Sequence, residues 1–158
     1  MWLVAAPGLA SAAEPATRAD VALRGMTFVS SRAGERDVVV EAERATLQPG
    51  TNVALLEGVH TVFEGRPGAP GFELTCDRGE LRTNTNDFFA SGHVRGRTAD
   101  GRSFTTEWVR YDHQRGLAYT DAPVEITENG GSYQGGGFRY HVREQRFRLL
   151  GGASLVRE

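Results

Sequence analysis

The sequence predicts an all-β domain in which antiparallel strands stack as repeats of about 30 residues. Three observations predict this class: a recurring phrase, short alternating apolar runs, and glycine-rich turn signals between the runs. The phrase places a small residue beside apolar ones, and its anchors are Gly25, Gly58, Gly92, Ala122 and Gly152. Self-similarity at a fixed period is typical of stacked units that each bury an apolar face on their neighbours.

The alternation identifies the strands in chain order. Apolar side chains occupy every second position, and Glu, Arg, Thr and His fill many of the positions between them, which is the period of a half-buried strand. The runs cover residues 38–43, 59–64, 72–77, 104–108, 124–127, 138–143 and 146–149. No segment after Val21 has the pattern of a long amphipathic helix. A sheet with one apolar face must fold over on itself as a jelly roll or sandwich, with its charged face outward.

Turn signals separate these runs. Asp100-Gly101 and Asn129-Gly130 favour tight hairpin turns, because both central residues of such turns need a positive φ. Pro49-Gly50 and 114–116 indicate further turns, and the Gly- and Pro-rich segment 65–71 is expected to be a longer loop.

Composition argues against several functions. The net charge is −2, and all 18 basic residues are Arg, so no broad electrostatic attraction to nucleic acid is expected. The single cysteine, Cys76, shares a strand face with Phe72 and Leu74 and is interpreted as a small core residue rather than a nucleophile. No nucleotide-binding loop or nucleophile elbow is present, so we expect neither an enzyme nor a bound cofactor.

Polar residues that could form a site fall on outward strand positions. His60 and His93 follow two of the anchor glycines, and this recurrence is better explained by equivalent outward positions than by metal ligation. Glu41 and Glu43, or Glu73 and Glu80, could form a carboxylate pair of a glycoside hydrolase, but Glu41 and Glu43 also lie on the polar face of an alternating strand.

The first 20 residues are set apart from the rest. Residues 1–13 are uncharged and mostly apolar, and 10–12 resemble a small-x-small cleavage signal, yet the segment is short for a membrane helix. We interpret residues 1–20 as a partial signal or anchor segment with a linker, and 21–158 as the β domain.

Six segments together resemble a known family. They read VVVEAERA (38–45), ALLEGV (54–59), LTCDRGEL (74–81), FASGHV (89–94), WVRYD (108–112) and DAPVEI (121–126). In this order and period, they resemble the periplasmic lipopolysaccharide-export proteins of the LptC, LptA and organic-solvent-tolerance type. The resemblance covers about Val21 to Val156. The opening strand 37–42 and the lack of a Lys-rich tail after the last strand favour LptC over LptA, whereas the short apolar N-terminus departs from LptC.

The resemblance implies a twisted antiparallel β-jelly roll that is open at both ends and holds lipid acyl chains along its interior. It implies a periplasmic protein, with or without an anchor in the inner membrane, that passes lipopolysaccharide from an inner-membrane ABC transporter complex toward the outer membrane. A neighbouring jelly-roll bridge protein would be a further partner. Two alternatives stay open: a soluble LptA-like bridge protein, and a structural β-repeat protein with a filled core.

The apolar residues divide into two candidate sites. We expect Phe104 and Trp108 to face inward, and the strand of about 146–156 to be an exposed edge that pairs with a neighbouring protein through its backbone. The interior lipid-binding candidates are Phe28, Val40, Leu47, Phe63, Phe72, Leu74, Leu81, Phe89, Phe104, Trp108, Tyr111, Phe138 and Tyr140, and the edge candidates are Phe147, Leu149, Leu155 and Val156.

Overall fold

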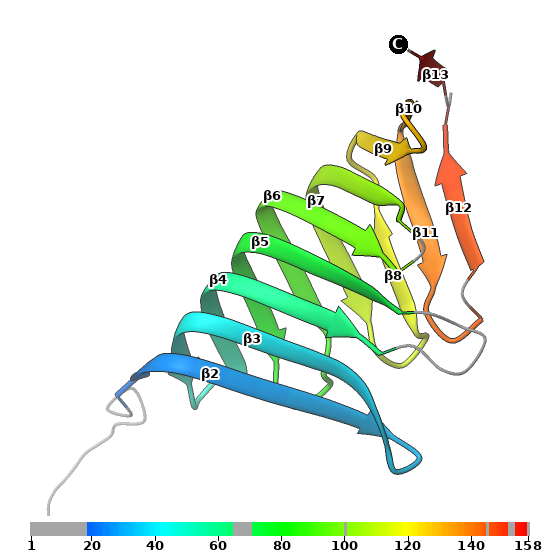
Figure 1. The fold of residues 1–158 in the computed structure, drawn as a ribbon. Coiled ribbons are helices and arrows are strands. Elements are labelled where there is room, and N and C mark those ends of the chain that lie inside the picture. Colours follow the sequence, from blue (N-terminus) through cyan, green and yellow to red (C-terminus); the bar gives the residue numbers. More distant parts are fainter. Residues whose placement is uncertain (1–18, 65–70, 100, 145, 152–153, 158) are drawn as a thin grey trace, which may run out of the picture.

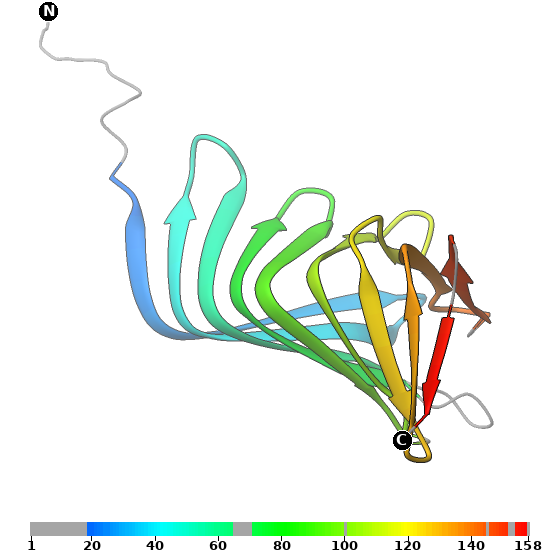
Figure 2. The ribbon, with the colours of Figure 1, turned by 90° about the horizontal axis from the view of Figure 1, so that it is seen from above.

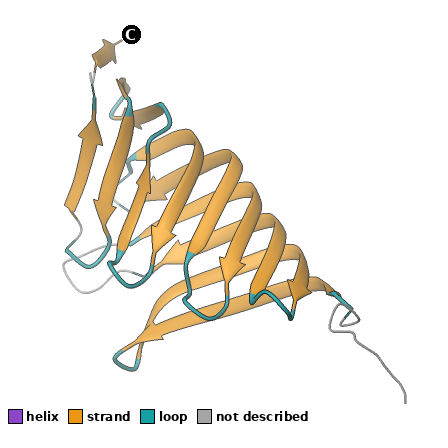
Figure 3. Ribbon diagram, turned by 180° about the vertical axis from the view of Figure 1, so that it is seen from behind, coloured by secondary structure: helices purple, strands orange, loops and turns teal. Residues whose placement is uncertain are grey.

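The structure, a computed structural model, describes residues 19–64, 71–99, 101–144, 146–151 and 154–157. Within these residues the chain consists of strands and turns, with no helix, so no described helix is long and apolar enough to cross a membrane. Figure 3 shows the strands running side by side along the whole domain. All of them pair antiparallel in one 12-stranded sheet, which confirms the predicted all-β class.

Six long strands are followed by six short ones (Figure 1). The long strands are β2 (Val21–Arg32), β3 (Glu35–Gln48), β4 (Val53–Phe63), β5 (Phe72–Arg82), β6 (Phe88–Thr98) and β7 (Ser103–Asp112). The short strands are β8 (Leu117–Thr120), β9 (Val124–Glu128), β10 (Gly131–Gly135), β11 (Gly137–His141), β12 (Arg146–Leu150) and β13 (Ser154–Arg157).

Each long strand pairs with the next one in sequence, and the short strands continue this order as two halves. One end of β7 pairs with β9 and its other end pairs with β8. The chain then pairs β9 with β10 and β8 with β11, and finally β10 with β13 and β11 with β12. The sheet therefore ends in three long strands that are each interrupted in the middle. The two halves of these strands are β8 and β9, then β11 and β10, then β12 and β13.

The long strands bend near their centres, so one sheet makes two facing layers (Figure 2). We call them layer A and layer B. Layer A contains 26–32, 35–42, 59–63, 72–76, 94–98, 103–106, β9, β10 and β13. Layer B contains 21–24, 44–48, 53–57, 78–82, 88–91, 108–112, β8, β11 and β12. This double-layered arrangement is the predicted jelly roll, and the apolar side chains lie between the layers.

Burial along β4 shows what a bend does to the alternation. Ala54 and Leu56 are buried on one side of Gly58, and Val59, Thr61 and Phe63 are buried on the other. The buried positions therefore change from even to odd numbers at the bend. A straight strand would keep one parity throughout.

Three of the recurring anchor glycines lie at these bends. Gly25, Gly58 and Gly92 sit in β2, β4 and β6 with φ values of 76°, 62° and 80°. A Cβ atom on Gly58 would lie 2.7 Å from the Glu43 side chain. The left-handed backbone favours glycine there, whereas the exposed Glu43 side chain could move aside for a Cβ atom. Ala122 falls in the break between β8 and β9, and Gly152 lies outside the described residues.

One predicted hairpin turn is fully described. Asn129 and Gly130 connect β9 to β10, and their φ values are 51° and 79°. Two successive positive φ values are the signature of a type I′ turn, so this prediction is confirmed. Asp100 of the other predicted hairpin lies outside the described residues, and Gly101 beside it has a φ of 97°.

Candidate functional site

The candidate site is the apolar space between layers A and B. Most of the interior residues expected from the sequence belong to one buried cluster. Phe63, for example, is 1% exposed. The cluster includes the predicted residues Val40, Phe63, Phe72, Leu74, Leu81, Phe104, Tyr111 and Phe138, and Phe28, Leu47 and Tyr140 pack against it while partly exposed.

Aromatic rings bring the two layers into direct contact. Phe63 and Phe72 stack within layer A with their ring centroids 4.3 Å apart. Phe63 meets Tyr111 of layer B edge-on at 5.1 Å, and Phe72 meets Tyr140 of layer B at 4.9 Å. In this conformation the interior beside these rings is therefore filled by side chains.

The same cross-layer packing recurs closer to the C-terminal strands. Phe104 of layer A contacts Phe138 of layer B edge-on, with ring centroids 5.0 Å apart. Phe138 in turn stacks on Phe147 of β12 at 5.4 Å. The apolar interior therefore continues to the last strands of the domain.

The opposite end of the interior is more open. Val21 and Leu23 of β2 pair with Leu47 and Ala45 of β3, and therefore share their inward face. Val21 is 45% exposed and Leu23 is 36% exposed, whereas Ala45 is buried. Phe28, farther along β2, is partly exposed as well. The first strand thus presents an apolar inner face that the described part of the domain leaves partly uncovered.

Two of the residues predicted to face the interior lie on the outer face instead. Trp108 and Phe89 are half-buried and alternate with the buried Val109 and Phe88, so they point to the outer face of layer B. The guanidinium of Arg110 lies over the Phe89 ring, 4.5 Å from its centroid. The prediction that Trp108 faces inward is wrong because β7 changes phase at its bend, between Thr106 and Val109.

Several interior residues were missed by the sequence reading. Phe88 and Val109 are 5% and 2% exposed, and both lie in the buried cluster. The period-2 alternation of a strand could have identified both residues. Phe88 is two residues from the buried Ala90, and Val109 is two residues from the buried Tyr111. The adjacent pair Phe88-Phe89 is inherently ambiguous, because only one of two neighbouring residues can face the interior.

Cys76 lies in the interior, as interpreted from the sequence. Its side chain is 7% exposed, and its thiol donates a hydrogen bond to the carbonyl oxygen of Arg78 at 3.1 Å. Burial raises the pKa of this thiol to about 11. A thiol with such a raised pKa is protonated at neutral pH and a poor nucleophile, which is typical of a structural cysteine.

The polar side chains gather on the outer face. His93 and Asp77 are joined at the bend by a contact of 2.6 Å between Nδ1 and Oδ2. His60 lies 3.5 Å from a carboxylate oxygen of Glu41 and 3.7 Å from one of Glu73. Among the described residues, no group of three or more His, Cys, Asp and Glu side chains is arranged to hold a metal ion.

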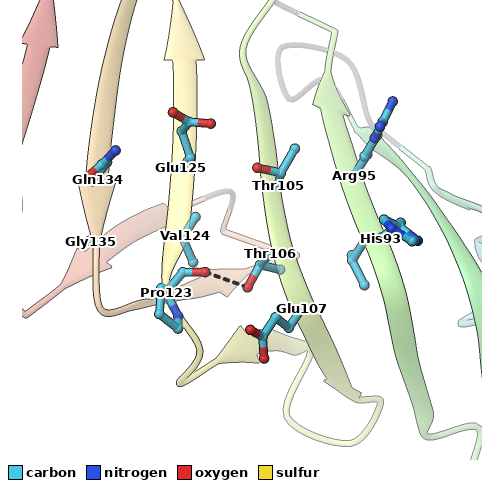
Figure 4. Close-up of a pocket in the computed structure, with 11 residues that line it drawn as sticks. His93, Arg95, Thr105, Thr106, Glu107, Pro123, Val124, Glu125, Gln134 and Gly135 are labelled. Carbon is cyan, nitrogen blue, oxygen red and sulfur yellow. Dashed lines mark hydrogen bonds between the residues drawn. The ribbon is translucent and has the colours of Figure 1, made fainter.

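Figure 4 shows residues that line a hollow on the outer side of the bend, where β7 parts from β9. Its volume is about 530 Å³. Arg95, Glu107 and Glu125 line it together with His93. The Thr106 hydroxyl donates a hydrogen bond to the Pro123 carbonyl at 2.9 Å and links the two strands there.

Both ends of the sheet are edges within the described residues. Strand β12 pairs with β11 and β13 pairs with β10, and neither has a second described partner. Phe147 and Leu149 of β12 are partly buried against the core. The backbone of Leu155 and Val156 lies in β13, and their side chains lie outside the described residues. Strand β2 is the edge at the other end.

Comparison with known proteins adds to this geometry. A family model described as "LptC: Lipopolysaccharide-assembly, LptC-related" matches residues 11–156. A search of curated proteins finds no significant match. Among solved structures, the chain is similar to LptH, the LptA-homologous periplasmic component of the lipopolysaccharide transport device from Pseudomonas aeruginosa. The TM-score is 0.58 at 13% identity, over 77% of this chain and 94% of that one, which shows a shared fold.

Proposed function

Because this chain belongs to the LptC-related lipopolysaccharide-assembly family, we propose that it is a periplasmic bridge component of lipopolysaccharide transport. It would pass lipid along the space between layers A and B, from an inner-membrane ABC transporter complex toward the outer membrane. The protein would act without catalysis, as is typical of this transport family. The observation that carries the proposal is the apolar interior, which runs from the half-open inner face of β2 to the last strands.

The mechanism follows from the cost of exposing hydrocarbon to water. Each CH₂ group kept from water is worth about 0.8 kcal/mol, so a lipid with several acyl chains does not leave the interior for solvent. The lipid can move between connected apolar interiors, provided that a partner protein supplies the energy that drives the movement. Since Phe63 contacts Tyr111 across the interior, acyl chains would need the two layers to move apart at this contact.

A pair of neighbouring residues on β2 provides a direct test. Phe28 faces inward and packs against the core, whereas Val29 faces outward and is 48% exposed. A photo-crosslinking amino acid at position 28 should capture lipopolysaccharide, and the same amino acid at position 29 should not. Equal capture at both positions, or capture at neither, would contradict an interior lipid path.

A structural protein with a filled core is the second candidate. The aromatic contacts between Phe72 and Tyr140 and between Phe104 and Phe138 favour it, because they occupy the interior in this conformation. A filled core predicts no binding of a fluorescent lipid probe to the purified protein. Saturable binding that unlabelled lipopolysaccharide displaces would exclude this alternative.

We also propose that the C-terminal edge, β12 and β13, pairs with a neighbouring jelly-roll protein. An unpaired strand offers backbone donors and acceptors to another chain, and such pairing would make the two interiors continuous. Proline removes one of those donors. Leu149→Pro and Leu155→Pro should therefore abolish partner binding while circular dichroism shows an intact β domain. Unchanged partner affinity in both variants would show that docking uses another surface.

The N-terminal segment bears on the choice between an LptC-like and an LptA-like role. Residues 1–18 lie outside the described part of the structure. We propose that residues 1–20 are part of a signal or anchor segment and linker that keeps the β domain at the inner membrane. Fractionation of cells that produce the full-length protein tests this: a membrane-bound domain released by cleavage after residue 20 supports the LptC-like role, and a freely periplasmic one supports the LptA-like role.

A further inference from the structure

One side chain in the interior has chemistry that the apolar core does not need. Thr61 lies on β4 in the inward register between Val59 and Phe63, and it is 0% exposed. Its neighbours in the sheet are Val40 on β3 and Leu74 on β5, both buried. The hydroxyl of Thr61 is thus surrounded by hydrocarbon, next to the ring that contacts Tyr111 of layer B.

The other buried hydroxyls are all satisfied. Ser30 Oγ accepts a hydrogen bond from the Asn86 side chain at 3.3 Å. Thr106 Oγ1 donates to the Pro123 carbonyl at 2.9 Å, and Thr120 Oγ1 accepts from the backbone N–H of Ala122 at 3.1 Å. Among the described buried side chains, Thr61 Oγ1 is the one polar atom without a hydrogen-bond partner.

An unsatisfied hydroxyl lowers stability, whereas Val has nearly the same size and would fill the same space without that cost. A buried polar atom that lacks a hydrogen-bond partner calls for an explanation. One explanation is a ligand that supplies the partner when it binds. Since the candidate site is the space that Thr61 faces, the missing partner would have to come from what enters that space.

We propose that the Thr61 hydroxyl donates a hydrogen bond to an oxygen atom carried by an acyl chain between the two layers. This inference rests on the proposed function, because it requires acyl chains in the interior. The ligand class is an acyl chain with a hydroxyl, ester or amide oxygen close to hydrocarbon, rather than a plain hydrocarbon chain. In the conformation that the structure describes, the Thr61 hydroxyl has no hydrogen-bond partner. The bound acyl chain would supply one, so Thr61 favours the lipid-loaded state.

The test compares two ligands that differ by one oxygen. A β-hydroxy fatty acid and the unsubstituted acid of the same length are used to displace a fluorescent lipid probe from the full-length protein. One hydrogen bond made in an apolar site predicts that the wild type prefers the hydroxy acid roughly threefold to tenfold, after correction for the difference in water solubility. In Thr61→Val this preference disappears, and in Thr61→Ser it remains.

Stability supplies a second readout with a matched control. Thr61→Val should raise the melting temperature of the lipid-free protein by about 2–4 °C, because it removes an unsatisfied polar atom. Thr120→Val, at an equally buried position whose hydroxyl has a partner, should lower the melting temperature and leave the ligand preference unchanged.

The outcomes separate this inference from the proposed function. If neither acid displaces the probe, the lipid-binding function fails. If both acids bind and Thr61→Val keeps the wild-type preference, lipid binding stands and the role of Thr61 is refuted. A lower melting temperature for Thr61→Val would also overturn the inference, since it would show that the hydroxyl already has a partner in the lipid-free protein.

Discussion

Residues 108 and 109 of β7 test the assignment of the two faces of layer B most directly. Val109 is 2% exposed in the interior, and Trp108 points outward, with its ring 6.0 Å from that of Phe89 and 6.3 Å from that of Tyr119. Val109→Asp removes a buried side chain and leaves a carboxyl group without partners, at a cost of about 3–6 kcal/mol. Trp108→Asp loses two loose aromatic contacts on the surface, worth about 1–2 kcal/mol.

The difference is large on the scale of protein stability, which is about 5–15 kcal/mol for a typical domain. Urea denaturation of both variants should show a modest loss of stability for Trp108→Asp and a several-fold larger loss for Val109→Asp. Photo-crosslinking adds a functional readout, with lipid capture expected from position 111 and not from position 108. If Trp108→Asp were the more damaging change, or if position 108 captured lipid, the outward placement of Trp108 would be wrong.

Two further predictions concern the interior. A Cβ atom on Gly96 would overlap the ring of the buried Phe104, so Gly96→Ala should cost about 1–3 kcal/mol in urea denaturation; Gly50→Ala, where a Cβ meets open space, should cost far less, and equal costs would refute the close packing. Burial raises the pKa of Cys76 from 9.0 to about 11, so the unfolded thiol loses its proton first and stability should fall between pH 9 and pH 11. Cys76→Ala should show a smaller fall over this range, and an identical pH dependence in both proteins would contradict the buried, protonated thiol.

Local sequence was sufficient for the strands that carry an alternating apolar run, for one hairpin and for much of the interior. The alternation of Phe72, Leu74 and Cys76 predicts a strand with one buried face, and β5 buries these three residues. Asn129 and Gly130 predict the turn found between β9 and β10, because few other residues accept two successive positive φ values. Both features depend only on neighbours in the chain, which is why they could be read without a structure.

The placement of Trp108 needed the tertiary structure. The residue lies two positions after Thr106, which is buried, and strict alternation would turn it inward. The bend in β7 changes the phase, so that Val109 and Tyr111 are the buried residues beyond it. Where a strand bends is decided by its pairing with the neighbouring strands, and this information is not contained in the alternation of one segment.

The character of the interior was likewise decided by contacts between distant residues. Sequence predicts that Phe63 and Tyr111 are apolar and inward, and it cannot tell a packed core from an open groove, because both need the same residue types. The fold brings these two rings, from opposite layers, within 5.1 Å of each other and leaves Val21 of β2 45% exposed. The sequence by itself therefore determined most of the side chains that line the interior. Where that interior is closed and where it is open was decided only by the folding of one bent sheet onto itself.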